Sequence, residues 1–213
     1  GTPGIKVTPE VVGKDAKVEV EVFVKNAKET QKLVYTLKDA EGNVVAEKET
    51  PASETVASFE IENVHLWHGK KDPYLYTAEV CLKSEDEVLD NVSARFGCRT
   101  FEIHPENGFI LNGEEYPLRG VSRHQDRWGI GNALLKEHHD EDMDLICELG
   151  ATTIRLAHYQ HDQYFYDLCD ERGMVVWAEI PYISTHMPNG RENTISQMKE
   201  LVVQNYNHPS IVV

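Results

Sequence analysis

The sequence predicts a multidomain chain in which an all-β immunoglobulin-like sandwich precedes a partial (β/α)8 TIM barrel. Two observations support this. Across the first hundred residues, short segments alternate apolar with polar side chains, which is the period of a half-buried strand. Beyond residue 118, short apolar segments alternate with segments of helical period, as in parallel strands joined by helices. We therefore assign residues 1–102 to the sandwich and 103–213 to the N-terminal half of a barrel.

The sandwich prediction depends on valine alternation and on frequent turn residues. Val18, Val20, Val22 and Val24 alternate with charged or polar neighbours, and Gly42 marks a turn between two such segments. The predicted strands cover 16–25, 33–37, 44–49, 55–61, 74–82 and 88–101, the last of them interrupted at Gly97. No segment shows a helical period, so an antiparallel sandwich is favoured.

A hairpin is predicted between the two domains. Asn112 and Gly113 stand between apolar segments, and both residue types tolerate the positive φ of a tight turn. Pro105 and Gly108 mark the junction that precedes it.

The second half repeats a strand and a helix three times. We predict strands at 118–122, 152–156, 174–178 and 210–213, and helices at 136–149, 162–172 and 194–206. Gly150 and Gly173 follow the first two helices, where glycine commonly ends a helix. Four strands cannot close a barrel of eight, so we expect about half of that fold.

Polar side chains follow the first three predicted barrel strands. They are Arg123, His124 and Asp126, then Arg155, His158 and Tyr159, then Glu179, Tyr182 and His186. Barrel enzymes carry their chemistry at these strand ends, and such donors suit a hydroxyl-rich ligand. Simpler explanations remain open: His124 could bind a loop carbonyl, and Arg155 could pair with a barrel carboxylate. His138 and His139 are expected to be solvated on their helix.

Composition narrows the possible partners. The net charge of −15 and the absence of a basic run argue against nucleic acid, and no apolar run is long enough for a membrane span. The four cysteines lack zinc spacing and are expected to be thiols, mostly buried. A metal hydrolase is disfavoured because only one histidine follows the first barrel strand. The compartment stays open between cytoplasm and periplasm.

Four motifs together resemble glycoside hydrolase family 2, most closely its β-galactosidases. They are Leu111-Asn-Gly, Leu118-Arg-Gly-Val-Ser-Arg-His, Ile154-Arg-Leu-Ala-His-Tyr and Asn207-His-Pro-Ser-Ile-Val-Val. The resemblance implies retaining hydrolysis of terminal β-galactosides in carbohydrate metabolism, by a parent enzyme expected to be a homo-oligomer. It implies that His124 and His158 bind the sugar and that Arg155 orients the nucleophile.

The same resemblance places both catalytic glutamates beyond Val213, so that the 213 residues alone should be inactive. It also suggests that the complete enzyme uses magnesium through His186, although Ser184 stands where a carboxylate ligand is expected; the chain itself should need no cofactor. Thr152, Leu156 and Gln160 depart from the family pattern. The alternative is a noncatalytic carbohydrate-binding or interaction module.

Overall fold

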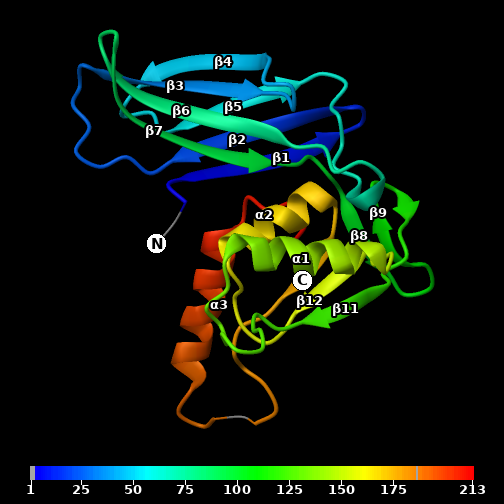
Figure 1. Cartoon of the computed structure of the whole chain (residues 1–213). Coiled ribbons are helices and arrows are strands. Elements are labelled where there is room, and N and C mark those ends of the chain that lie inside the picture. Colours follow the sequence, from blue (N-terminus) through cyan, green and yellow to red (C-terminus); the bar gives the residue numbers. More distant parts are fainter. Residues whose placement is uncertain (1–2, 186) are drawn as a thin grey trace. The chain divides into compact units, whose positions relative to one another are not determined.

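The computed structural model describes residues 3–185 and 187–213, which form two compact units (Figure 1). The first unit comprises the chain up to Trp67 together with Tyr74–Thr100, and the second comprises His68–Pro73 with Phe101–Val213. A short stretch of the first half of the sequence thus belongs to the second unit.

The first unit is a sandwich of two antiparallel sheets, as predicted (Figure 1). One sheet has the order β1-β2-β5 and the other the order β4-β3-β6-β7. The strands are β1 (Ile5–Val12), β2 (Asp15–Val22), β3 (Gln31–Lys38), β4 (Val44–Pro51), β5 (Val56–Ile61), β6 (Tyr76–Ser84) and β7 (Glu87–Phe96). Alternate residues of β2, β3 and β6 fill the core between the sheets, so the predicted period of two is the physical basis of this unit.

Three strands of the predicted hairpin region form a small sheet. β8 (Phe101–His104), β9 (Gly108–Leu111) and β10 (Glu114–Glu115) pair antiparallel in the order β10-β9-β8. Asn112 and Gly113 turn between β9 and β10 with φ values of 52° and 78°, which confirms the predicted hairpin. The Tyr116 hydroxyl behind this hairpin accepts a hydrogen bond from the Lys70 amide at 2.9 Å, within the 3₁₀ helix η1 (Gly69–Lys71).

The rest of the second unit is the start of a parallel barrel. Strands β11 (Gly120–Arg123), β12 (Thr153–Leu156) and β13 (Val175–Ala178) are parallel and adjacent in chain order. Helices α1 (Lys136–Glu148), α2 (Gln163–Arg172) and α3 (Arg191–Asn205) follow them. The predicted fourth strand appears as hydrogen bonds from Val176 N to Ser210 O, 2.8 Å, and from Ala178 N to Val213 O, 2.7 Å. The described strands do not close a barrel.

The two faces of this parallel sheet differ. Ile154, Leu156 and Val176 point toward the helices and share a buried core with Met143 of α1 and Phe165 of α2. α1 and α2 lie side by side against that face (Figure 1).

The opposite face carries Ser122, Arg155 and Trp177 in one cross-strand row, since Ser122 pairs with Arg155 and Arg155 with Trp177. In a barrel, this second face is the interior.

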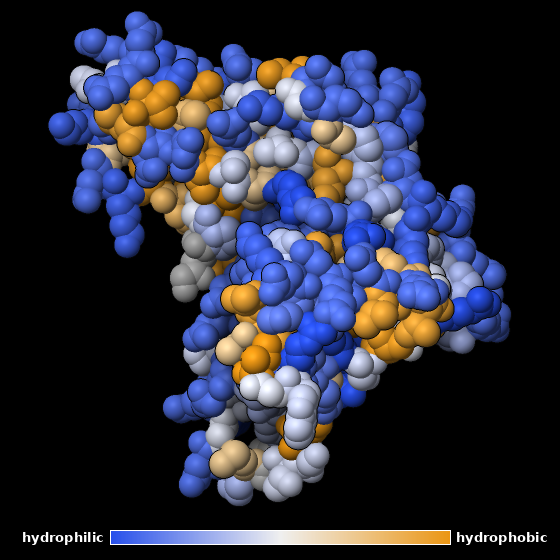
Figure 2. All heavy atoms as spheres, viewed as in Figure 1, coloured by the Kyte–Doolittle hydropathy of each residue, from blue (hydrophilic) through white to orange (hydrophobic). Residues whose placement is uncertain are grey.

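Hydrophilic side chains cover most of the face shown in Figure 2, as expected from 36 acidic and 21 basic residues. Within the described residues, no helix combines the length and apolar character that a membrane span requires. All four cysteines are free; Cys98 and Cys169 are buried, and burial raises the pKa of the Cys98 thiol to about 12. The predicted thiol state therefore holds, although Cys81 and Cys147 are only partly buried.

Candidate functional site

Three side chains meet at the carboxyl ends of β12 and β13. Arg155 Nε lies 2.5 Å from Glu179 Oε1, and Arg155 Nη2 lies 3.1 Å from Glu179 Oε2. His158 Nδ1 lies 2.9 Å from Arg155 Nη2 and 3.0 Å from Glu179 Oε2. Arg155 therefore has the barrel carboxylate as its partner, one of the two explanations that the sequence left open.

The fork of Arg155 keeps Glu179 ionised. Burial by itself raises the pKa of Glu179, but the hydrogen bonds from Arg155 and His158 and the charge of Arg155 outweigh it, so the pKa lies below its ordinary value. A carboxylate in this state is an anchor for neighbouring donors and a poor proton donor at neutral pH.

His158 and His124 offer ring nitrogens beside this pair. Nδ1 of His158 either donates to Glu179 or accepts from Arg155, and in both tautomers Nε2 remains for another partner. His124 is exposed, and its ring meets the His158 ring edge-on, with centroids 5.2 Å apart at 70°. The Tyr159 ring also packs against His124, with centroids 6.1 Å apart. The structure thus brings His124, His158, Arg155 and Glu179 together.

Arg123 does not join this group, which corrects its expected place at the rim. It is the last residue of β11 and shares the face of Val121, so its side chain is buried on the helix side. Arg123 Nε and Nη2 lie 2.9 and 2.8 Å from Asp142 Oδ2 of α1. Its guanidinium also packs over the Phe165 ring, 3.8 Å from the centroid. Arg123 ties the first strand to α1 and α2.

His139 is likewise not solvated as expected, because it completes this buried cluster. Arg123 Nη2 lies 3.0 Å from His139 Nδ1, and Arg123 Nη1 lies 3.1 Å from His161 Nδ1. Burial, and then the charge of Arg123, lowers the pKa of His139. Burial lowers the pKa of His161 to about 4, the hydrogen bond to Ala157 O acts against this shift, and Arg123 adds to it. Both rings are neutral at pH 7. His138 is half-buried, and its Nδ1 accepts from Leu135 N at the start of α1.

Sequence reasoning missed Gln125, which joins the loops after β11 and β12. Its backbone amide donates to the Tyr159 hydroxyl at 3.0 Å, and its Oε1 accepts from the Asp162 amide at 2.6 Å. Asp162 in turn caps α2 by accepting from Tyr164 N. No motif marks a glutamine for such a contact, because both partners belong to a loop 34 or more residues away.

The remaining residues that the sequence predicts for the site are Asp126, Tyr182 and His186. Asp126 and Tyr182 are exposed. His186 lies outside the described residues. The loop before it, 181–185, contains no carboxylate, and Glu179 is already bound to Arg155 and His158. Within the described part of this loop, the donors therefore do not fit a hard cation such as Mg²⁺, which prefers carboxylate oxygens.

Comparisons with known proteins agree with this architecture. Residues 3–99 match the model of glycosyl hydrolases family 2, and residues 101–213 match the TIM barrel domain of the same family. The chain belongs to glycosyl hydrolases family 2. The family resemblance and the fold class predicted from the sequence are confirmed.

Similar proteins carry two kinds of name. A β-glucuronidase of Bacteroides fragilis is 38% identical over 99% of this chain and 33% of its own length. A β-galactosidase of Thermoanaerobacter pseudethanolicus is 32% identical over 97% of this chain and 27% of its own length. The chain therefore spans about a third or less of these relatives.

Two solved structures show the same fold. The FMN-binding β-glucuronidase from Facaelibacterium prausnitzii L2-6 matches with a TM-score of 0.95 and 45% identity, over 100% of this chain and 33% of that one. A putative β-galactosidase from Bacteroides fragilis matches with a TM-score of 0.91 and 40% identity, over 99% of this chain and 33% of that one.

The Asn207-His-Pro-Ser motif of the family has a structural place here. His208 Nδ1 lies 2.6 Å from Asp170 Oδ2, and Ser210 N donates to Asp170 Oδ1 at 3.1 Å. Asp170 is buried in α2. Asp167 lies close enough for the three side chains to share a cation, but both Asp170 oxygens already have partners. The motif fastens the start of the fourth strand to α2.

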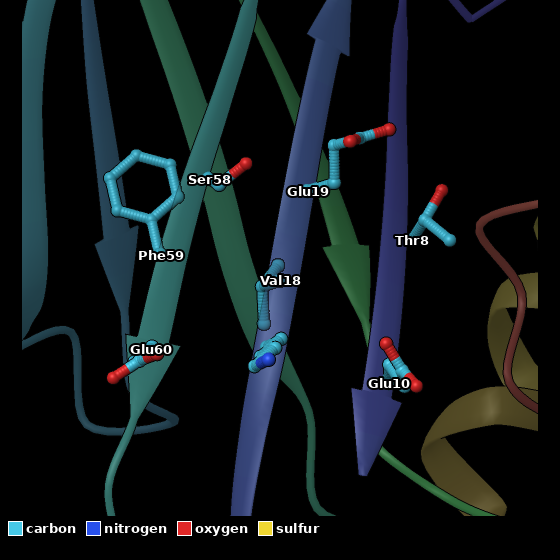
Figure 3. Close-up of a pocket in the computed structure, with 8 residues that line it drawn as sticks. Thr8, Glu10, Val18, Glu19, Ser58, Phe59 and Glu60 are labelled. Carbon is cyan, nitrogen blue, oxygen red and sulfur yellow. The ribbon is translucent and has the colours of Figure 1, made fainter. Parts of the chain in front are cut away.

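The sandwich has a hollow of its own, on the outer face of β1, β2 and β5 (Figure 3). Glu10, Lys17 and Glu60 face one another across the three strands, and Glu19 lies in the neighbouring row. Phe59, the aromatic residue of this region, is buried in the core. The residues that line this hollow include no exposed ring, so the hollow lacks the stacking surface that a sugar-binding site needs, and the second unit is the better candidate.

Proposed function

We propose that His124 and His158 bind the non-reducing sugar of a terminal β-glycoside in a retaining family 2 glycosidase, beside the Arg155–Glu179 pair. The observation that carries this proposal is the convergence of these four side chains at the carboxyl ends of three parallel strands. Imidazole nitrogens, which can donate or accept hydrogen bonds, are suited to sugar hydroxyl groups. Arg155, already holding Glu179, is the residue we propose to orient the nucleophile.

Two glycones are candidates, and we favour β-glucuronides. Relatives named β-glucuronidase are 38% and 45% identical to this chain. β-Galactosides are the second candidate, because the strand-one motif suggests them and because Arg155, the cation of this cluster, is paired with Glu179 and is not free for a uronate. The initial rates of the full-length protein on 4-nitrophenyl β-glucuronide and β-galactoside decide between them. A higher kcat/KM for the galactoside would overturn our preference.

The acid/base and nucleophile are proposed to lie outside this set of residues. Glu179 is held ionised by Arg155 and His158, which makes it unsuited to protonate a leaving group. We therefore expect the purified 213-residue chain to show no turnover of either nitrophenyl glycoside. Turnover that persists after further purification would contradict this assignment. The homo-oligomer expected of the parent enzyme stays a proposal.

A further inference from the structure

We propose that Gln125 is a positioning residue that holds His124 in its sugar-binding orientation. This inference rests on the proposed role of His124. It starts from the position of His124, which is exposed at the end of β11 and receives no hydrogen bond on its ring from the described part of the chain. Its ring is oriented by its backbone and by ring contacts with His158 and Tyr159.

Gln125 fixes that backbone from the next position in the chain. Its amide donates to the Tyr159 hydroxyl, and its side-chain Oε1 accepts from the Asp162 amide. These two bonds run in opposite directions between the same two loops. A loop fixed at both the backbone and the side chain of one residue cannot swing without breaking both bonds.

The loop on the receiving side is itself well anchored. His161 is buried against Arg123 at 3.1 Å, and the Gln160 side chain accepts from Asn205 of α3 at 3.0 Å. Asp162 caps α2. Gln125 therefore joins the segment that carries His124 to a segment that α2, α3 and β11 all hold. Gln160, whose side chain makes this bond to Asn205, occupies the position at which the family pattern has proline.

The hydrogen bond between Gln125 and Tyr159 also bears on the orientation of the His124 ring. Tyr159 both accepts from Gln125 and packs on the His124 ring, so one side chain controls the backbone and the ring plane together. A displacement of about 1 Å in a substrate-binding group can cost roughly a hundredfold in rate. Gln125 thus acts on the reaction through His124 and touches no substrate.

The test measures the effect of Gln125→Ala twice in the full-length protein, once in the wild type and once in the His124→Ala variant. His124→Ala is measured first; an unchanged kcat/KM would refute the proposed sugar contact itself. Given a loss there, Gln125→Ala should lower kcat/KM by roughly tenfold to a hundredfold in the wild-type background. In the His124→Ala background it should have less than about a twofold further effect, because its target is gone. An equal loss in both backgrounds, or no loss in either, would overturn the positioning role.

Further variants distinguish the positioning of His124 by Gln125 from a general effect of Gln125 on the stability of the protein. Gln125→Glu keeps the acceptor oxygen near the start of α2, where a negative charge is favourable, and should recover most of the activity. Gln197→Ala on α3 is the matched control and should leave kcat/KM unchanged. If Gln125→Ala fails to fold, Tyr159→Phe is compared in the same two backgrounds, since it removes the hydroxyl acceptor alone. Failure of Gln125→Glu to recover activity would count against the proposal.

Discussion

At the scale of single residues, the Arg155–Glu179 pair is the strongest interaction of the candidate site. Two nitrogens of one guanidinium face two oxygens of one carboxylate, and the Glu179 side chain is only 16% exposed. Two-point geometry and partial burial make such a pair stronger than a typical surface ion pair.

We expect this pair to show measurable coupling. A double-mutant cycle with Arg155→Ala and Glu179→Ala, read by urea unfolding at pH 7, should give a coupling free energy of about 1–2 kcal/mol. The control is Arg172 with Asp144, an ion pair whose side chains are 44% and 63% exposed; it should give less than about 0.5 kcal/mol. Equal coupling in the two pairs would contradict the argument from geometry and burial.

The buried histidines make stability depend on pH in a defined window. The folded-state pKa of His161 is about 4, below its unfolded value near 6.5, so the unfolded state binds more protons between these limits. Stability is therefore fully present above about pH 6.5 and declines as pH falls toward 4, by up to about 3 kcal/mol. The lowered pKa of His139 acts with the same sign.

A single substitution tests this source of acid sensitivity. His161→Asn keeps an oxygen where Nδ1 accepts from Arg123 but has no titrating ring. Urea unfolding at pH 7 and pH 5 should show a smaller pH-dependent loss in this variant than in the wild type. His104→Asn is the control, since His104 is exposed on β8. A loss of stability in His161→Asn that matches the wild type would assign the effect to other groups.

Residue positions were predictable where chain periodicity decides them. His124, Arg155, His158 and Glu179 were expected at strand ends, and they meet there. Arg123 was misplaced, although the period of two sets it on the same face as Val121. The Gln125 contacts could not be predicted, because loop-to-loop hydrogen bonds leave no periodic pattern in a single sequence.

At the scale of elements, the two helix-ending glycines offer a matched pair. Gly150 and Gly173 have φ values of 75° and 68°, so a side chain at either position is strained. They differ in their surroundings. A Cβ on Gly150 would meet open space, whereas a Cβ on Gly173 would collide with the backbone of Gly69 and Lys70 in η1.

We therefore expect unequal costs for the same substitution. Gly150→Ala should destabilise the protein by about 1 kcal/mol, the cost of left-handed backbone with a side chain. Gly173→Ala should cost more, by about 1–3 kcal/mol, since backbone atoms must move. Thermal unfolding of the two variants measures the difference. Equal shifts in Tm would contradict this expectation and would mean that η1 moves away from the new side chain at no cost in stability.

Strands and helices were predicted wherever their period was clear. β1 was missed because Pro9 interrupts the alternation of apolar and polar residues. The strand lies at the edge of its sheet, where proline is tolerated. β7 ends at Phe96, directly before Gly97, where the predicted last long strand is interrupted. The first turn of α3 was also missed, since Arg191–Asn193 carries no apolar residue to mark it.

At the scale of the whole molecule, the two compact units are not separated by a single cut in the sequence, because the second unit includes a short segment from the first half of the chain. Residues 68–73 sit between two sandwich strands in the chain, yet they belong to the second unit, through Tyr116 and the close approach to Gly173. This six-residue segment has no periodicity, so the sequence gives no sign of its partners. The overall class could be predicted because it depends only on the order and period of the elements.

The row of Ser122, Arg155 and Trp177 places a fluorescent tryptophan next to the candidate site. Trp67 is fully buried and Trp128 fully exposed, whereas the Trp177 indole is half-exposed and lies in register with Arg155. An occupant seated on Arg155 and His158 would displace water from that indole and shift its emission to shorter wavelength. Trp67, which is already fully buried, would contribute a constant background. The chain therefore contains an intrinsic fluorophore beside the surface on which we place the sugar.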